Sequence, residues 1–387
     1  MTETPTWLRQ MAASGEVDAE WAAIFRRLPR HLFLPDRMWP FTGYPARSAV
    51  VDRGVDPVMW RRWADSDTAM VTQWDDGRHR GREAGRFPTS SGSRPSLVAR
   101  MLAALDVRPG HRVLDVGAGT GWTAALLALR AGAEGVVAVE VDPGVAEAAR
   151  ARLRAVGLKP PVVTGDGDAG WPAGAPYDRV QAGFAVLRVP GAWIRQTRPG
   201  GLIVLPWCTG FTVGGGLVLL RVGDGGTATG RFFHPVGFMV SRSQRCAAPP
   251  GGEPLPPPGA AESTTRVPHG DLLGGRYGTA AFVVGTLVPE AVHTASEWSD
   301  GLLRVCFHSL RCGSRAVVFF CPLGGCDGCE QRVVQWGDRR VWDEVERAYT
   351  WWTGRGRPEL TRFGLSASAD GRGQSVWLDR PDRPVAL

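Results

Sequence analysis

Three acidic residues and a series of glycines lie at intervals that could hold a nucleoside. Residues 113–128 read VLDVGAGTGWTAALLA, so an apolar run meets Asp115, passes through Gly117, Gly119 and Gly121, and continues in a helical pattern. A glycine-rich turn between a strand and a helix lets the backbone approach a ligand, and the helix N-terminus favours polar or anionic groups. Taken alone, such a turn could also serve only to pack a helix tightly onto a sheet.

Two later stretches favour the ligand interpretation. Glu140 ends the next expected strand, about 20 residues after the last glycine, where an acid can bind the two hydroxyls of a ribose. Asp166 and Gly167 end the third expected strand, where an acid can meet the amino group of adenine. Because the carboxyl ends of parallel strands line one crevice, these residues together predict an adenosine site.

The surroundings of the glycines indicate which adenosine compound is bound. The Gly-x-Gly-x-x-Gly spacing of a dinucleotide site is absent, and the only lysine, Lys159, is not part of a phosphate-binding loop. Asp115 would repel phosphate but suits the ammonium group of S-adenosylmethionine. The sequence therefore resembles a class I methyltransferase that uses this cofactor and releases S-adenosylhomocysteine. The expected cofactor-binding residues are Asp115, Gly117, Gly119, Gly121, Glu140, Asp166 and Gly167.

The elements that must position these residues alternate regularly from Arg112 onwards. Apolar strand patterns such as RVLDVGA, GVVAVEV, PVVTGD and YDRVQAGFAV are separated by helical patterns such as WTAALLALRAG and GVAEAARARLRAVG. Such alternation is typical of parallel βαβ units with helices on both faces of a sheet. The predicted fold class is α/β, a doubly wound Rossmann-like sheet accompanied by a smaller α+β domain.

Composition suggests where the domains begin and end. Residues 1–245 are expected to form the methyltransferase domain, with a helix near Glu16–Leu28 and a long polar loop or cap over residues 40–95 that covers the active site. Residues 246–269, rich in Pro and Gly, are expected to be a linker or exposed loop. Residues 270–387 are expected to form an accessory domain for substrate recognition. It should contain strands near Ala280–Val288 and Ala316–Phe320, a helix over Val341–Trp352 and a closing strand pair near 363–380.

Several motifs resemble those of the protein-L-isoaspartate O-methyltransferase family, over roughly residues 20–240. They are, in order, RRLPRHLFLP, PTSSGSRPSLVARML, the glycine loop, GDGDAGWPAGAPYDRV and VPGAWIRQTRPGGLIVLPW. Two further stretches, SDTAMVTQWDDG and WDEVERAYTWW, resemble a longer actinobacterial branch of that family. Members of that branch accompany ribosomally made lanthipeptides, graspetides and lasso peptides, and methylate aspartate in a modified precursor peptide.

The resemblance also implies which residues meet the substrate. It places Ser93 at the family's substrate-side serine, and Ser91 is a second candidate for aligning a carboxylate. Repair enzymes of the family have Thr-Ile-Ser-Gln/Ala-Pro where this chain has Ser91-Gly92-Ser93-Arg94-Pro95, and they are shorter, lacking anything like residues 270–387. Both differences favour a dedicated substrate over general repair.

The expected function is O-methylation of an aspartate carboxylate in a precursor peptide, leading through the methyl ester to a succinimide and isoaspartate. The alternatives are repair of isoaspartate in damaged proteins, and a catalytically silent module that binds the cofactor or a peptide. A carboxylate is already ionised at neutral pH, so neither a strong base nor a metal is required. The QAGFAV stretch also lacks the Asn/Asp-Pro-Pro-aromatic element of amine methyltransferases.

The remaining features restrict partners and location. The net charge of +7 comes almost entirely from arginine, without a basic run of five or more, so it fits codon bias better than an acidic partner, and no nucleic acid is expected. The N-terminus has no signal pattern and no apolar stretch suits a membrane span, so a cytoplasmic location is expected. The protein is also expected to be a monomer.

Two clusters leave their interpretation open. The cysteines Cys306, Cys312, Cys321, Cys326 and Cys329, with His308 among them, could bind zinc, but their spacing favours free thiols and no metal is expected. The adjacent acids Asp75 and Asp76 could bind an ion or a substrate arginine, although a solvated loop is the simpler interpretation.

Overall fold

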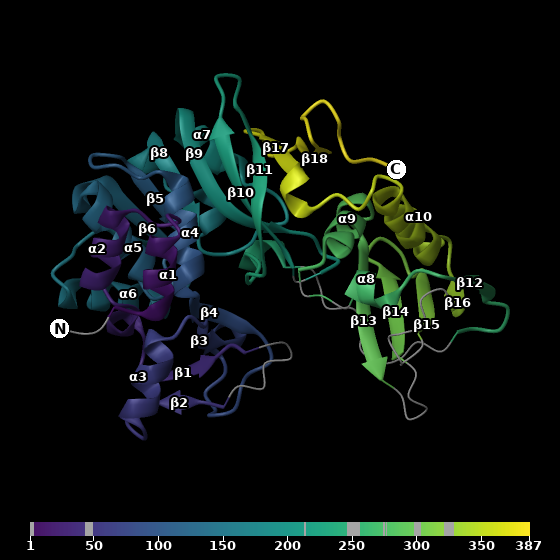
Figure 1. Ribbon diagram of the computed structural model, residues 1–387, viewed down its shortest axis with the longest axis horizontal. Coiled ribbons are helices and arrows are strands. Elements are labelled where there is room, and N and C mark those ends of the chain that lie inside the picture. The colour runs from purple at the N-terminus through teal and green to yellow at the C-terminus, as the bar shows by residue number, and fades with distance from the viewer. Residues whose placement is uncertain are drawn as a thin grey trace.

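The computed structural model describes residues 4–42, 49–212, 214–245, 256–273, 275, 277–297, 303–320 and 329–387. The described residues form three sheets (Figure 1). A nine-stranded sheet lies at the centre, a four-stranded sheet belongs to the cap below it, and a five-stranded sheet belongs to the C-terminal unit.

The parallel half of the central sheet has the doubly wound order β9-β8-β5-β6-β7, in which every neighbouring pair is parallel. Successive crossovers run to opposite sides of β5, so the carboxyl ends of β5 and β8 flank the point where the strand order reverses. Ligands of open α/β sheets bind at such a point. The strands are β5 (Val113–Val116), β6 (Val136–Glu140), β7 (Val162–Thr164), β8 (Tyr177–Ala182) and β9 (Thr197–Cys208).

Helices cover both faces of this sheet because its buried strands are apolar on both sides. Val113 packs with the helices of one face, whereas its neighbour Leu114 packs into the core on the other. The first face holds α1 (Thr6–Ala13), α2 (Ala19–Arg27), α4 (Pro95–Leu105), α5 (Trp122–Ala131) and α6 (Pro143–Ala155). The second face holds α7 (Gly191–Gln196) and, further along the sheet, the C-terminal unit.

The cap is a folded sheet rather than the long polar loop that the sequence suggested. Its tryptophans explain the difference, because Trp60 and Trp74 are buried in two small cores instead of being displayed on the surface. The cap strands have the order β2-β1-β3-β4 and are all antiparallel. The elements are β1 (Arg37–Pro40), β2 (Val51–Asp52), α3 (Pro57–Asp65), β3 (Met70–Trp74) and β4 (Pro88–Gly92).

The central sheet continues beyond β9 through antiparallel strands, and the last two come from the far end of the chain. The order is β9-β10-β11-β17-β18, so residues 363–378 complete the methyltransferase sheet. Assigning all of 270–387 to an accessory domain was therefore wrong. The alternating residues Phe363, Leu365 and Ala367 are buried against the sheet's own core. The strands are β10 (Gly215–Val222), β11 (Thr227–Val236), β17 (Phe363–Ser368) and β18 (Gln374–Leu378).

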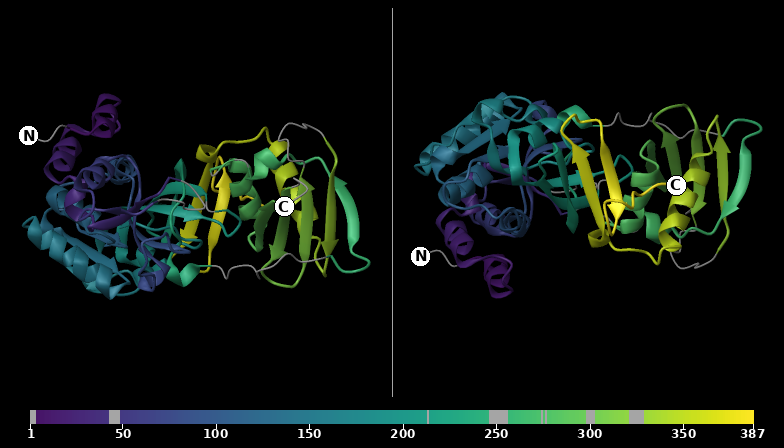
Figure 2. Two further views of the ribbon diagram at one scale, coloured as in Figure 1. Left: turned by 90° about the horizontal axis from the view of Figure 1, so that it is seen from below. Right: turned by 90° about the horizontal axis from the view of Figure 1, so that it is seen from above.

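The C-terminal unit is thus inserted between β11 and β17. Its antiparallel sheet has the order β12-β16-β15-β14-β13, and β12 lies within residues 246–269, which the sequence suggested to be a linker or loop. The elements are β12 (Ala261–Thr265), α8 (His269–Leu273), α9 (Thr279–Leu287), β13 (Ala291–Glu297), β14 (Leu303–Ser309), β15 (Arg315–Phe320), β16 (Gln331–Trp336) and α10 (Val341–Thr353). Figure 2 shows this sheet at the far end of the molecule from α1 and α2.

A strand was expected over Ala280–Val288, but Thr279–Leu287 form helix α9. The run AAFVVGTLV is apolar apart from Thr286, and such a short run does not distinguish a buried strand from a buried helix. The helix is buried on several sides because it packs between the central sheet and the sheet of the C-terminal unit.

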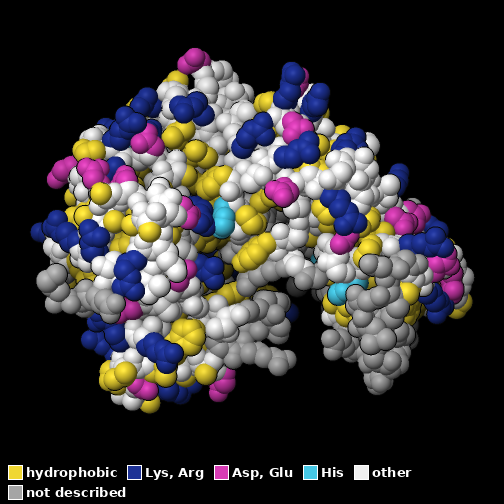
Figure 3. All heavy atoms as spheres, in the orientation of Figure 1, with side chains coloured by type: hydrophobic (Ala, Val, Ile, Leu, Met, Phe, Trp, Pro, Cys, Tyr) yellow, Lys and Arg dark blue, Asp and Glu magenta, His cyan; other side chains and the backbone are white. Residues whose placement is uncertain are grey.

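Figure 3 shows that the molecule is indented between the cap and the C-terminal unit. On that face the basic side chains are scattered among acidic ones and do not gather in one patch. None of the helices within the described ranges is long and apolar enough to cross a lipid bilayer.

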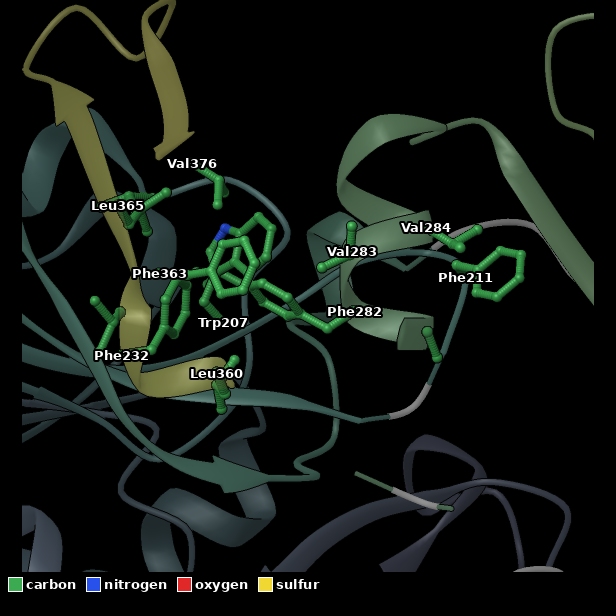
Figure 4. Packing of buried hydrophobic residues seen from close by; sticks show 14 of the residues in the cluster. Trp207, Phe211, Phe232, Phe282, Val283, Val284, Leu360, Phe363, Leu365 and Val376 are labelled. Carbon is green, nitrogen blue, oxygen red and sulfur yellow. The ribbon is translucent and has the colours of Figure 1, made fainter. Parts of the chain in front are cut away.

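One continuous core joins the C-terminal unit to the central sheet (Figure 4). The ring of Phe282 on α9 lies 5.6 Å from the ring of Trp207, 5.1 Å from that of Phe232 and 5.6 Å from that of Phe363. These three partners come from β9, β11 and β17. The two units therefore share one apolar cluster and are expected to unfold together.

This shared core leads to the first prediction. Phe282→Ala should lower the free energy of unfolding by about 3–5 kcal/mol, because it leaves a cavity among aromatic rings. Urea unfolding followed by tryptophan fluorescence measures the change. The exposed Phe87 is the matched control, and Phe87→Ala should shift stability by no more than about 0.5 kcal/mol. Separate transitions for the two units, with only one of them shifted, would contradict the shared core.

Candidate active site

The turn after β5 contains glycine positions at which a residue with a side chain would not fit. Gly117, Gly119 and Gly121 have φ angles of +82°, +53° and +88°, in the left-handed region. A Cβ atom at Gly117 would lie 2.6 Å from the ring of Phe184, which follows β8. The turn therefore needs glycine both for its conformation and for the close packing at the switch point.

Glu140 is joined to this turn at the end of β6. It is 8% exposed, and its two carboxylate oxygens accept hydrogen bonds from the backbone N–H of Gly119 (2.9 Å) and of Asp142 (3.1 Å). Burial raises the pKa of Glu140, while these two hydrogen bonds and the charge of Arg242 act against the rise. The carboxylate is thus fixed beside the turn, with lone pairs left to accept from a ligand.

Asp115 lies in the middle of the sheet, without solvent exposure. Its Oδ1 accepts a hydrogen bond from Nε2 of Gln181 on β8 at 3.1 Å. Burial, with a smaller contribution from the negative charge of Glu140, raises the pKa of Asp115 to about 8. Within the described part of the chain, Oδ2 of Asp115 and Oε1 of Gln181 have no hydrogen-bond donor.

These two buried acceptors test whether the site suits the expected cofactor. A buried acceptor without a donor is costly, so the pair calls for a group with several N–H donors. The ammonium of S-adenosylmethionine has three such donors and a positive charge that would favour ionised Asp115. The residues present therefore fit the cofactor.

Asp166 and Gly167 lie at the end of β7, next to β6. The N–H of Gly165 donates to the carbonyl of Glu140 at 2.9 Å, which ties the two strand ends together. Asp166 is exposed and accepts a hydrogen bond from the N–H of Asp168 at 3.0 Å through Oδ1, leaving Oδ2 available. A Cβ at Gly167 would lie 2.6 Å from the side chain of Val116, so this position also requires glycine. The structure thus brings the predicted cofactor-binding residues of β5, β6 and β7 to one edge of the sheet.

The two candidate serines lie where the cap meets the glycine turn. Ser91 is on β4, and a Cβ placed on Gly119 would lie 3.6 Å from its carbonyl oxygen. Ser93 follows β4 and precedes α4. Among the described residues, neither hydroxyl has a hydrogen-bond partner, so both can accept from or donate to a substrate.

Arg30 holds this serine segment in place and was not identified from the sequence. It is 3% exposed, and its guanidinium donates to the carbonyls of Ser93 (2.9 Å) and Ala64 (2.9 Å). Further bonds reach the carbonyls of Trp63, Ser66, Thr68 and Gly92. Burial lowers the pKa of Arg30 to about 10, and the charges of Asp67 and Asp65 act against the fall. The only sequence signal for Arg30 was its place in the RRLPRHLFLP motif. Nothing in that motif indicates that the side chain binds backbone carbonyls.

A cavity of about 490 Å³ lies between the cap and the glycine turn. Trp39 and Trp74 line it from the cap, Gly119 and Thr120 from the turn, and Arg152 from α6. The cavity therefore adjoins the glycine turn at Gly119, and neither Asp115 nor Asp166 is among the described residues that line it.

The acids Asp75 and Asp76 have partners within the chain. Asp75 accepts hydrogen bonds from the N–H groups of Arg86 (3.0 Å) and Phe87 (2.8 Å), so it shapes its own loop. Asp76 forms ion pairs with Arg242 (3.1 Å) and Arg245 (3.0 Å). Asp76 is thus paired with arginines of this chain, where the sequence left an ion, a substrate arginine or solvent as possible partners.

The structure describes only part of the cysteine cluster. Cys312 and Cys329 form no disulfide bond within the described residues, Cys306 lies on β14, and Cys321 and Cys326 lie outside the described residues. Within the described ranges, no group of three or more His, Cys, Asp or Glu residues could hold a metal ion.

Comparison with known proteins agrees with this geometry. Residues 84–211 match the family model of protein-L-isoaspartate(D-aspartate) O-methyltransferase. A protein-L-isoaspartate O-methyltransferase of Methylorubrum populi is 45% identical over 162 residues, which are 40% of this chain and 73% of that protein. One of Ignicoccus hospitalis is 42% identical over 33% of this chain and 64% of its own length.

A solved structure named protein-L-isoaspartate O-methyltransferase covers 97% of this chain and 99% of its own, with a TM-score of 0.52 and 21% identity. The likeness confirms the predicted methyltransferase fold class. It also extends over the C-terminal unit, so the fold of residues 270–387 has a counterpart in that solved structure, whereas the Methylorubrum populi relative matches 40% of this chain.

The buried Asp115 leads to a prediction about pH. Between its unfolded pKa of 3.8 and its folded pKa of about 8, the native protein holds a proton that the unfolded chain releases. Because the native state binds more protons than the unfolded state, the free energy of unfolding falls as the pH rises through that window. Asp115→Asn has no carboxyl group to titrate, so its stability should not fall in this way. The variant should therefore gain stability relative to the wild type between about pH 5 and about pH 8.

Urea unfolding of the ligand-free proteins at several pH values measures this difference. Asp224→Asn, at an exposed position, is the control and should follow the wild type at every pH. Parallel pH profiles for Asp115→Asn and the wild type would show that Asp115 is not the titrating group.

Proposed function

The chain belongs to the protein-L-isoaspartate O-methyltransferase family, and on that premise we propose that it methylates the free carboxylate of isoaspartyl residues in peptides or proteins. It is an S-adenosylmethionine-dependent protein carboxyl methyltransferase. The observation that carries the proposal is the meeting of the strand ends with the serine segment. Asp115, Glu140 and Asp166 lie on or just after β5, β6 and β7, whose carboxyl ends share one edge of the sheet, and the carbonyl of Ser91 lies beside Gly119.

Different residues of the crevice are proposed to bind different groups of the cofactor. We assign the ammonium group to Asp115 and Gln181, the ribose hydroxyls to Glu140 and the adenine amino group to Asp166. Gly117, Gly119, Gly121 and Gly167 let the backbone approach. When bound, S-adenosylmethionine supplies a methyl group on a positively charged sulfur, which keeps the electron pair of the broken C–S bond.

The chain itself has to bind, orient and desolvate the accepting carboxylate. That carboxylate is ionised at neutral pH, so no residue needs to remove a proton. We propose that the hydroxyl of Ser93 donates to one carboxylate oxygen and leaves the other free to attack, with Ser91 as a second donor. Arg30 fixes the backbone of this segment, which supports alignment, and alignment accounts for much of the barrier reduction in such displacements.

A second candidate keeps the same chemistry but changes the acceptor. Arg94, where repair enzymes have Gln or Ala, is exposed directly after Ser93, and this difference favours a dedicated peptide. The acceptor would be the side-chain carboxylate of one aspartate in a ribosomally made, modified precursor peptide. In either case the methyl ester can lose methanol when the next backbone nitrogen attacks it, which gives a succinimide and then isoaspartate and aspartate. The third alternative, a catalytically silent module that binds the cofactor or a peptide, is disfavoured because Ser91, Ser93 and the three acids are all present.

The substrate proposal is tested with two synthetic peptides that differ only in isoaspartate or aspartate at one position. Incubation with enzyme and S-adenosylmethionine, followed by mass spectrometry, should add one methyl group to the isoaspartyl peptide and none to its aspartyl twin. Methanol loss without further enzyme should follow. Methylation of the aspartyl peptide alone would replace this proposal with the precursor-peptide candidate.

The role of Ser93 is tested with the accepted peptide. Ser93→Ala should lower kcat about tenfold, the effect of losing one hydrogen bond, while the affinity for S-adenosylhomocysteine stays unchanged. Ser375→Ala, on β18, is the matched control and should leave both values as they are. Equal kcat values for the two variants would remove Ser93 from the reaction.

A further inference from the structure

Residues 241–245, which follow β11, cross the cofactor edge of the sheet and contact several elements there. The segment begins beside β8, since the N–H of Ser241 donates to the carbonyl of Ala185 at 2.8 Å. Gln244 then accepts hydrogen bonds from the N–H groups of Leu187 (2.9 Å) and Arg188 (2.8 Å). We call residues 241–245 the strap.

The strap is bound at the end of β7 through Asp168. The carboxylate of Asp168 accepts from the hydroxyls of Ser241 (3.1 Å) and Ser243 (2.6 Å) and from the amide of Gln244 (2.9 Å). Asp168 follows Asp166, the residue assigned to adenine, by two positions. The strap therefore adjoins the adenine side of the crevice.

Arg242 binds the opposite side, at the end of β6 and on the cap. Its guanidinium lies 3.3 Å from Asp142 Oδ2, 3.1 Å from Asp76 Oδ1 and 3.1 Å from Gln73 Oε1. Asp142 caps α6 and follows Glu140, the residue assigned to ribose, by two positions. Arg242 is only 27% exposed, so its ion pairs are partly shielded from water.

The same contacts lead on to the serine segment. Gln73 also accepts a hydrogen bond from the hydroxyl of Thr89 (2.9 Å), and that hydroxyl accepts from the N–H of Asp76 (3.1 Å). Thr89 is on β4, two residues before Ser91. A chain of hydrogen bonds thus connects the loop after Glu140, the strap and the strand that carries Ser91.

We propose that Arg242 is a positioning residue that holds the strap across the nucleoside end of the crevice and couples cofactor binding to the placement of β4. The inference rests on the proposed function only for the identity of the cofactor. It concerns how the crevice is closed and not which carboxylate is methylated.

The charges around Arg242 support this role. Burial opposes ionisation of Asp142, but hydrogen bonds from Gln73, from the N–H of Val145 and from Arg242 outweigh it and lower the pKa of Asp142. The positive charge of Arg242 also acts to lower the pKa of Glu140. Removing Arg242 would leave two partly buried carboxylates at the ribose end without their cation, which weakens the site.

Calorimetric titration with S-adenosylhomocysteine, without any peptide, tests the proposal. Arg242→Ala should weaken binding about tenfold, the effect of losing charge-assisted hydrogen bonds. Arg242→Lys should restore only part of the affinity, because an ammonium cannot match the fork of a guanidinium. Arg266→Ala, which breaks an exposed ion pair with Glu330 in the C-terminal unit, is the control and should bind as the wild type does. Equal affinities for the Arg242→Ala and Arg266→Ala variants would overturn the proposal.

Two measurements on the wild type hold even if a variant fails to fold. Raising NaCl from about 0.05 M to about 0.5 M should weaken binding of S-adenosylhomocysteine, because salt screens the ion pairs of the strap. Hydrogen exchange of residues 73–78 and 241–245 should slow together when the ligand is added. Salt-independent affinity, or protection of only one of the two segments, would overturn the coupling. Because no peptide is present, none of these results depends on which carboxylate is methylated.

Discussion

The arrangement of the site depends on one buried guanidinium. Arg30 lies between the cap and the methyltransferase sheet, and a cation at that depth is tolerated only when its N–H groups are all directed at acceptors. Its acceptors are carbonyls of two separate backbone segments, residues 63–68 and 92–93. If either segment moved away, the guanidinium of Arg30 would lose hydrogen-bond acceptors that water could not replace at that depth. The burial of this charge thereby fixes the backbone of Ser93 relative to residues 63–68 of the cap.

The features that could be predicted from the sequence were those set by residues close together along the chain. The turn at Gly117–Gly121, and Glu140 and Asp166 at the ends of the next strands, follow from local strand–turn–helix patterns, and the structure places them together. Arg30 and Arg242 could not be found in this way. Their partners are distant in sequence, and nothing about an isolated arginine indicates whether it will be buried or solvated.

The errors in the fold have the same origin. The apolar run that forms α9 suits a strand or a helix equally, and only the surfaces on both sides of it decide. The β17–β18 pair was recognised as two strands, but strands do not specify their neighbours by composition. The cap was mistaken for a loop because its small cores rely on a few tryptophans spaced irregularly along a polar segment.

The insertion of the C-terminal unit between β11 and β17 has a consequence for biosynthesis. Thr227 pairs with Ser368, so the edge of β11 stays open while the ribosome makes the whole intervening unit. An unpaired edge strand invites pairing with other chains, and long-range pairings form slowly. During translation, the packing of α9 against Phe232 can shield the newly made sheet before its last strands arrive. The inserted unit is thus placed to cover an apolar face of the central sheet before the chain is complete.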